Sequence, residues 1–165
     1  MIRAPRVPFF TSMPEFKIPE SVLVVIYSSE MEVLLIERAD KQGFWQSVTG
    51  SKDAIDEPLI ETAIREVQEE TGLQIGSERV PLENLHNWQL SNVYEIYPLW
   101  RHRYAPGITH NTEHVFGLLI PRDHPITLAA REHVQYQWLP WQAAAEQCFS
   151  PSNAEAILQL PRQIN

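Results

Sequence analysis

The order of apolar and polar residues predicts a series of short strands around one amphipathic helix. Residues 21–28 (SVLVVIYS) form a continuous run rich in β-branched side chains, which indicates a buried strand. Residues 32–38 (EVLLIER) follow after three turn-like residues, so the two segments predict a hairpin. Further strands are expected in four segments, 86–90, 93–103, 113–120 and 134–139, the last of which alternates with period two.

Residues 58–71 predict the helix. Their apolar side chains recur at about 100° per residue and form one stripe: Leu59, Ile60, Ala63, Ile64 and Val67. Gly72 stands where helices commonly end. Two short helices are expected near the C-terminus, one over 141–148 and one capped by Ser152 or Asn153 and running to about Leu160.

The order of strands, helix, strands and helices predicts an α+β fold with layered packing. At 165 residues the chain has room for one domain with a full core, which we assign to residues 21–165. Residues 1–20 are interrupted by four prolines and are expected to form an N-terminal arm. The arm has no continuous apolar segment, so it does not resemble a signal peptide.

Composition excludes several classes of protein. The formal net charge of −8 argues against general binding to a nucleic-acid backbone. No apolar run approaches the roughly 18 residues that cross a bilayer, so we expect no membrane partner. Cys148 is the only cysteine, which excludes an intramolecular disulfide and is typical of a reducing compartment, with the cytoplasm as the expected location.

The predicted helix carries a cluster of acids that stability alone does not explain. Glu66 and Glu70 are one turn apart and Glu69 lies beside them. Like charges at this spacing disfavour a helix by a few tenths of a kcal/mol per pair, and they lie in the half where the helix dipole favours cations. A bound Mg²⁺ would offset the repulsion, because clustered carboxylate oxygens are its preferred ligands. A solvated acidic surface is the alternative.

The segment from Gly50 to Leu73 resembles the signature of the Nudix hydrolase family, G-x5-E-x7-R-E-U-x-E-E-x-G-U, where U is apolar. Residues 65–73 (REVQEETGL) match it at every fixed position. Six residues separate Gly50 from Glu57 where the pattern has five, and a loop tolerates such an insertion. Asp56 has the right distance from Gly50 and Glu57 has the right distance from the helix, so either acid fits, with Glu57 favoured.

This resemblance implies a Nudix-type α/β/α sandwich around a mixed sheet, and metal-dependent hydrolysis of a pyrophosphate linkage. It assigns Glu66, Glu69, Glu70 and the main-chain carbonyl of Gly50 to Mg²⁺, for which Mn²⁺ could substitute. It gives Arg65 an ion pair that orients the carboxylates. Nudix enzymes often add a carboxylate from a loop, and Glu132 beside His133 is the candidate for a second metal ligand or general base, with an ordinary exposed acid as the alternative.

Three further stretches resemble one branch of the family, the dihydroneopterin triphosphate pyrophosphatases of folate biosynthesis. They are 44–51 (FWQSVTGS), 101–113 with RHRYAPG and NTE, and 132–139 with EH and YQWL. On the predicted strand, Arg101 and Arg103 would face the same side and bind phosphate, or else neutralise surface acids. Trp45 is expected either to stack on a flat heterocycle or to belong to the core, and Arg38 either to reach phosphate or to pair with an aspartate.

The expected reaction is hydrolysis of a small-molecule triphosphate, dihydroneopterin triphosphate, to the monophosphate and pyrophosphate. One alternative is a housekeeping pyrophosphohydrolase of nucleoside and deoxynucleoside triphosphates, which the signature does not distinguish. A catalytically silent Nudix-fold binding module is another, although such a module would lose the carboxylates that are present here. The acidic net charge argues against an RNA-end pyrophosphohydrolase.

Overall fold

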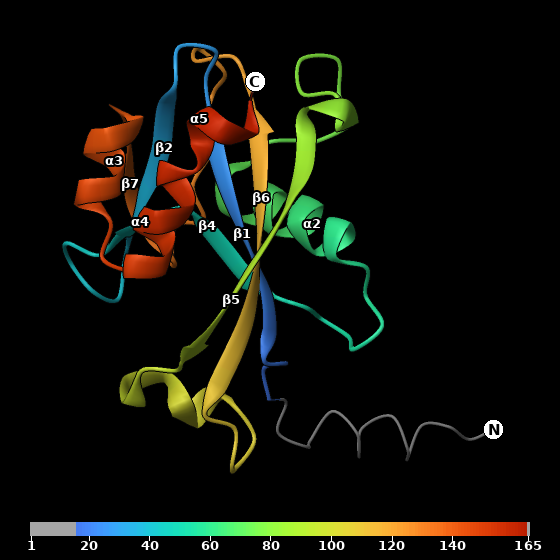
Figure 1. Cartoon of the computed structure of the whole chain (residues 1–165), viewed down its shortest axis with the longest axis vertical. Coiled ribbons are helices and arrows are strands. Elements are labelled where there is room, and N and C mark those ends of the chain that lie inside the picture. The colour runs from blue at the N-terminus through green and yellow to red at the C-terminus, as the bar shows by residue number, and fades with distance from the viewer. Residues whose placement is uncertain (1–15, 165) are drawn as a thin grey trace.

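A computed structural model describes residues 16–164 of the protein (Figure 1). Most of the predicted arm, residues 1–15, lies outside the described residues. The last part of the arm is held against the domain. The main-chain N–H of Lys17 donates to the carbonyl of Arg103 at 2.8 Å, and the carbonyl of Pro19 accepts from Thr112 at 3.1 Å.

A seven-stranded mixed sheet forms the centre of the molecule. Its strands are β1 (Glu20–Tyr27), β2 (Glu32–Arg38), β3 (Trp45–Gln46), β4 (Val48–Ser51), β5 (Leu85–Glu95), β6 (His110–Leu119) and β7 (His133–Pro140). The order is β3-β2-β1-β6-β5, with β4 paired to β1 and β7 paired to β2. β1 and β6 are parallel, whereas β5 and β6 are antiparallel. The predicted α+β class with a mixed sheet is therefore confirmed.

Helices cover both faces of this sheet. α2 (Leu59–Thr71) lies on one side, and α3 (Trp141–Gln147), α4 (Pro151–Leu158) and α5 (Leu160–Gln163) lie on the other (Figure 1). Alternate side chains of β1 pack in two separate cores, one on each face of the sheet. Val22, Val24 and Ile26 pack in the core that contains α2, and Leu23 and Val25 pack in the core that contains α3 to α5. Burial on both faces explains the continuous apolar run in this strand.

The helix α2 begins and ends where the sequence indicated. Pro58 precedes its first turn, and Gly72 adopts φ 76° and donates its N–H to the carbonyl of Gln68. Ala63 and Val67 are fully buried against the sheet. Ile60 is 40% exposed, so the predicted apolar stripe is narrower than the sequence pattern.

Two predictions about the second half of the chain are wrong. Segments 86–90 and 93–103 are not two strands: β5 spans both up to Glu95, with a bulge at which Gln89 has φ 61°. Pro98–Arg103 then form the 3₁₀ helix η2, which begins with a proline that cannot donate to a strand ladder. The cap of α4 is Ser150, because Pro151 occupies the first helical position.

No helix in the described part of the chain is long and apolar enough to cross a bilayer.

Candidate active site

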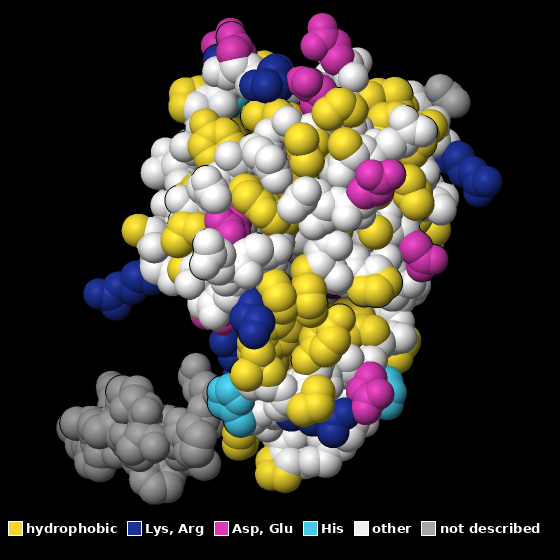
Figure 2. All heavy atoms as spheres, turned by 90° about the vertical axis from the view of Figure 1, so that its left-hand side faces the viewer, with side chains coloured by type: hydrophobic (Ala, Val, Ile, Leu, Met, Phe, Trp, Pro, Cys, Tyr) yellow, Lys and Arg dark blue, Asp and Glu magenta, His cyan; other side chains and the backbone are white. Residues whose placement is uncertain are grey.

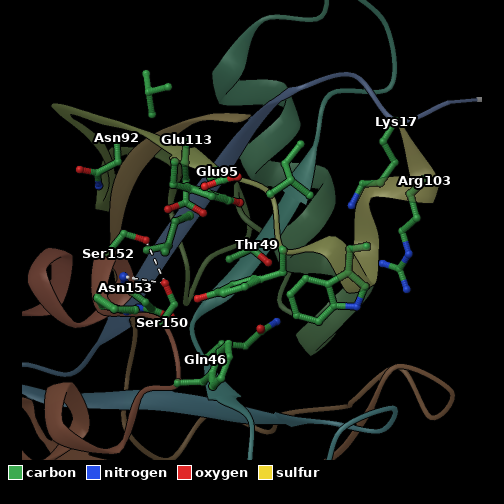
Figure 3. A pocket seen from close by; sticks show the side chains of 18 of the residues that line it. Lys17, Gln46, Thr49, Asn92, Glu95, Arg103, Glu113, Ser150, Ser152 and Asn153 are labelled. Atoms are coloured by element: carbon green, nitrogen blue, oxygen red, sulfur yellow. Dashed lines mark hydrogen bonds between the residues drawn. The ribbon is translucent and has the colours of Figure 1, made fainter. Parts of the chain in front are cut away.

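A cleft in two parts lies where α2, β4, β6 and η2 meet. Two cavities of about 700 Å³ and 640 Å³ are continuous through eight shared residues: Lys17, Arg38, Gln46, Thr49, Tyr94, Arg103, Tyr104 and Glu113. We call the smaller cavity the acidic part; Glu66, Glu69, Glu70 and Glu132 line it. We call the larger cavity the aromatic part; Tyr94, Tyr97, Trp100 and Phe149 line it (Figure 3).

The acidic part is built around two carboxylates of α2, the buried Glu70 and the partly buried Glu66. Glu70 is 4% exposed, and its Oε1 has no hydrogen-bond partner among residues 16–164. Burial raises the pKa of Glu70 well above its usual value, and the adjacent Glu66 carboxylate raises it further. Burial also raises the pKa of Glu66, whereas the Glu69 side chain is 57% exposed. Two acids therefore stand side by side where burial strengthens their repulsion.

Arg65 holds this arrangement in place. Its guanidinium donates to Glu57 at 3.0 and 3.2 Å, to Glu66 at 2.9 Å and to the carbonyl of Ser51 at 3.1 Å. Glu57 also accepts from the Asp53 N–H, and its pKa falls to about 2, chiefly through the bonds from Arg65. The acid that pairs with Arg65 is thus Glu57 rather than its neighbour Asp56, and the extra residue is accommodated in the loop before α2.

The acidic part fits a divalent cation. The unpartnered Oε1 of Glu70 and the raised pKa values of the two carboxylates are both relieved by a positive charge. Gly50 lets the Glu66 carboxyl group lie directly against β4, because a Cβ at residue 50 would overlap that carboxyl group. Within residues 16–164 no group of three or more acidic, His or Cys side chains is already gathered for a metal, so a cation would draw in the exposed Glu69 or Glu132.

Glu132 also lines the acidic part. It is exposed, its main-chain carbonyl accepts from the Ala39 N–H at 2.8 Å, and its charge is one of those that raise the pKa of Glu70. His133 is 5% exposed, and Nε2 lies 3.9 Å from Glu70 Oε1. Burial lowers the pKa of His133 to about 4, so the imidazole is neutral near pH 7. Glu132 therefore lines the same cavity as Glu70 and acts on it electrostatically.

Three cations stand between the two parts of the cleft. Arg38 donates to both carboxylate oxygens of Asp40 at 2.7 and 2.8 Å and lies 4.7 Å above the ring of Trp100. Arg103 is 3.9 Å from the same Asp40 carboxylate. Lys17, which the sequence did not indicate, lies beside Arg103, and burial lowers the pKa of its ammonium group. The cleft of an acidic protein thus contains a local site for anions.

For Arg101 and Trp45 the structure agrees with the second of the two predicted alternatives, pairing with a surface acid and packing in the core, and not with substrate binding. Arg101 pairs with Glu95, donates to the Ile96 carbonyl at 3.0 Å and lines a shallow surface pocket outside the cleft. A 3₁₀ helix has about three residues per turn, so residues two apart diverge instead of facing the same side. Trp45 packs against the core of β1 and α3 to α5, as its core alternative required.

The aromatic residues of the cleft escaped the sequence analysis. Phe149 stacks on Phe44 with ring centroids 3.6 Å apart and contacts Tyr97 at 5.5 Å, and Tyr97 in turn contacts Trp100. Figure 2 shows apolar side chains gathered on this face of the molecule, between its upper body and its lower end. These residues come from three separate segments, so no local spacing could have identified them.

Comparison with known proteins agrees with this geometry. The NUDIX domain profile matches residues 17–160. Dihydroneopterin triphosphate diphosphatase of Escherichia coli (strain K12) is 42% identical over 145 residues, which are 87% of this chain and 93% of that protein. The Haemophilus influenzae protein of the same name is 40% identical over 146 residues, 88% of this chain and 89% of the relative.

Solved structures show the same relationship. The E. coli dihydroneopterin triphosphate pyrophosphohydrolase superposes with a TM-score of 0.79 at 42% identity, over 87% of this chain and 95% of that one. A hydrolase from Listeria monocytogenes superposes with a TM-score of 0.72 at 20% identity, over 89% and 94% of the two chains, and supports the fold alone. The region that the profile matches contains the whole acidic part of the cleft.

Proposed function

This chain belongs to the Nudix family of hydrolases that act on pyrophosphate bonds, and from that premise we propose that it hydrolyses dihydroneopterin triphosphate to the monophosphate and pyrophosphate. The observation that carries the proposal is the continuity of the cleft. Buried carboxylates occupy one part, aromatic rings line the other, and cations stand between them. A flat heterocycle that carries a triphosphate has the same three chemical regions in the same order.

The aromatic part suits the pterin ring. Its volume of about 700 Å³ lies within the usual range of small-molecule sites. Trp100 and Tyr94 offer flat faces to a planar ring, and stacking of this kind contributes about 1–3 kcal/mol. The phosphates would then extend past Arg103 and Lys17 towards the carboxylates of α2.

The acidic part supplies the chemistry. Glu66, Glu70, Glu69 and the carbonyl of Gly50 would hold Mg²⁺, or Mn²⁺ in its place, and the metal when bound would neutralise phosphate charge and lower the pKa of water. Arg65 keeps the Glu66 carboxylate in position through its 2.9 Å bond and its pair with Glu57.

Glu132 is proposed as the general base, because it is exposed to solvent and lines the same cavity as Glu70. A water molecule held by this carboxylate loses a proton as it attacks phosphorus. Arg103 and Lys17 face the departing pyrophosphate and stabilise the charge that develops on it. His133 is neutral near pH 7 and therefore does not compete for the metal-binding carboxylates as a cation.

The test is a substrate panel in which pyrophosphate and phosphate are measured separately, with and without Mg²⁺. Dihydroneopterin triphosphate should release pyrophosphate with a kcat/KM at least tenfold above those of dATP and oxidised dGTP. Higher values for the nucleotides would assign the chain to the housekeeping alternative. Absence of pyrophosphate release from every substrate would support the silent binding module.

A pair of variants on α2 tests the metal site. Glu70→Gln should lower kcat by about 10²-fold or more, because it removes a buried charged ligand. Glu61→Gln is the matched control: this exposed acid in the first turn of the same helix lies away from the cleft and should leave kcat unchanged. A Glu70→Gln enzyme with the wild-type rate at saturating Mg²⁺ would contradict the proposed site.

We also propose that residues 21–165 form the single Nudix domain and that the protein acts in the cytoplasm on a small molecule. Both hydrophobic cores draw on residues between β1 and α5, which supports one domain. Lys17 shows that the end of the arm, residues 16–20, contributes to the cleft. The single cysteine and the net charge of −8 support a reducing compartment and a substrate other than nucleic acid.

A further inference from the structure

One buried carboxylate of the cleft has no role in the chemistry described above. Glu113 lies on β6 between Ser21 of β1 and Asn92 of β5, so it stands in the middle of the sheet. It is 4% exposed and lines both parts of the cleft. Its Oε1 has no hydrogen-bond partner within the described part of the chain. Figure 3 shows its carboxylate on the wall of the aromatic part, on the side that carries Ser152.

A carboxylate in this position destabilises the free protein. Burial raises the pKa of Glu113 to about 7, and among the described residues a hydrogen bond from the Ser152 side chain opposes this shift. A buried acceptor without a donor costs about 1–3 kcal/mol, more when it is charged, and a methyl or amide side chain would avoid the cost. Glu70 belongs to α2, whereas Glu113 shares one face of β6 with Val115, which packs in the core that contains α3 to α5, so Glu113 lies on the face of the sheet away from α2 and lines the aromatic part.

A second unpartnered acceptor lies nearby on the same strand. Asn111 is two residues before Glu113, so the two side chains share one face of β6. The amide nitrogen of Asn111 donates to Ser21 Oγ at 2.7 Å and to the hydroxyl of Tyr94 at 3.1 Å. Its Oδ1 is buried and makes no hydrogen bond to the described residues. This wall of the cleft therefore presents acceptors that lack donors.

We propose that Glu113 selects the substrate by accepting two N–H donors from the edge of a 2-amino-4-oxo ring, which in a pterin are N3–H and the 2-amino group. The inference rests on the proposed function for the identity of the ring, and guanine presents the same pair of donors. A carboxylate has two acceptor oxygens and matches two parallel N–H groups. The aromatic walls would hold the plane of the ring while Glu113 determines which edge is accepted.

Rings with other hydrogen-bonding edges should bind to this wall less tightly. Hypoxanthine lacks the 2-amino donor, so one carboxylate oxygen stays unpaired. Adenine presents one donor and one acceptor, and its ring nitrogen would face a carboxylate oxygen. A site built for a hydrogen bond rejects analogues that lack it more strongly than an apolar pocket does, because its own polar group is left unpaired.

The experiment compares kcat/KM for dihydroneopterin triphosphate, GTP, ITP and ATP in three proteins: wild type, Glu113→Gln and Glu61→Gln. Slow nucleotides are measured as inhibitors of whichever substrate in the panel is turned over. GTP and ITP differ only by the 2-amino group, so wild type should prefer GTP by about 10-fold to 150-fold, the value of one hydrogen bond to a charged group. This comparison needs no variant.

Glu113→Gln replaces one acceptor by a donor. It should lower kcat/KM for dihydroneopterin triphosphate and GTP by about 10-fold to 150-fold and bring the GTP to ITP ratio close to one. The ratio of kcat/KM for ATP to that for GTP should rise, because the glutamine amide matches the donor and acceptor of adenine. Glu61→Gln is the control: this exposed acid on α2 lines neither part of the cleft, and its loss should leave the ratios unchanged.

Equal values for GTP and ITP in wild type would overturn the inference, as would Glu113→Gln with unchanged ratios. If wild type turns over GTP but not dihydroneopterin triphosphate, the proposed function fails, and the GTP to ITP ratio still decides the role of Glu113. A melting temperature for each variant separates loss of fold from loss of selectivity, since a destabilised protein loses activity on all four substrates in equal proportion.

Discussion

Substitution of Gly50 by alanine should remove activity while it leaves the fold intact. A Cβ built on Gly50 would lie far inside the 3.0 Å below which real Cβ atoms are essentially not found, and the atoms it meets are the carboxyl carbon and both oxygens of Glu66. Ordinary contact begins at 3.4 Å, so the carboxylate has to retreat by about 1 Å or more. The group that moves is the far end of a flexible side chain, and the strand β4 can stay in place.

The cost to the reaction follows from that displacement. A shift of about 1 Å in a catalytic constellation lowers the rate by about 10²-fold. Glu66 also loses its alignment with Arg65, whose 2.9 Å bond fixes the present position of the carboxylate. We therefore expect kcat to fall by about 10²-fold, with a change of less than about 1 kcal/mol in the free energy of unfolding, since the new contact is with a side chain that can turn towards the cleft.

The assays are steady-state pyrophosphate release at saturating Mg²⁺ and urea unfolding. Gly76→Ala is the control, because Gly76 has φ 105° and open space around it, so alanine there strains the loop without touching the cleft. The double variant Gly50→Ala with Glu66→Ala should be no less active than Glu66→Ala alone, since the clash acts through Glu66. Wild-type kcat in Gly50→Ala would refute this reasoning, and so would a further loss in the double variant.

Three more predictions concern single side chains. Arg103→Ala should lower kcat/KM for the triphosphate by about tenfold or more, with kcat itself reduced, because Arg103 is proposed to stabilise the departing pyrophosphate. Arg101→Ala should leave kcat and KM within about twofold, because Arg101 lies outside the cleft. Trp100→Leu should raise KM by about tenfold, because it removes a stacking surface. Trp45→Leu should lower the free energy of unfolding by about 1–3 kcal/mol and leave KM unchanged. A raised KM in Trp45→Leu and not in Trp100→Leu would place Trp45 in the substrate site. Glu57→Gln should lower the free energy of unfolding by about 1–2 kcal/mol at pH 7. Because the pKa of Glu57 is depressed to about 2, this difference from wild type should shrink as the pH falls from 4.5 towards 2. Urea titrations that show the same difference at every pH would contradict the prediction.

The elements that the sequence predicted well are those whose pattern is local. β2 spans Glu32–Arg38 and α2 spans Leu59–Thr71, both within one residue of the expected bounds. In each, the spacing of apolar residues decides which face is buried, and a turn or a left-handed glycine marks the end. The acid cluster was predictable for the same reason, because spacing along one helix determines which carboxylates lie side by side.

Segment 93–103 shows where this reasoning stops. Its apolar and aromatic residues have the composition of a strand, but Pro98 cannot donate to a ladder, and the chain turns into η2. The turn separates Arg101 from Arg103 and brings Trp100 beneath Arg38, a residue more than sixty positions earlier. Contacts over such distances depend on how the sheet is assembled, which the pattern within the segment does not contain.

The active site therefore divides into a local and a long-range half, and the two halves should respond differently to mutation. The proposed metal ligands Gly50, Glu66 and Glu70 come from β4 and α2, which are adjacent in sequence, and changes there should lower kcat for every triphosphate by the same factor. The aromatic part combines β5, η2, β6 and the segment around Phe149, and changes there should alter the ratios between substrates. Gly50→Ala should lower kcat for all substrates by the same factor, whereas Glu113→Gln should change the ratios of kcat/KM between substrates. Both results together would show that one part of the cleft carries the reaction and the other selects the substrate.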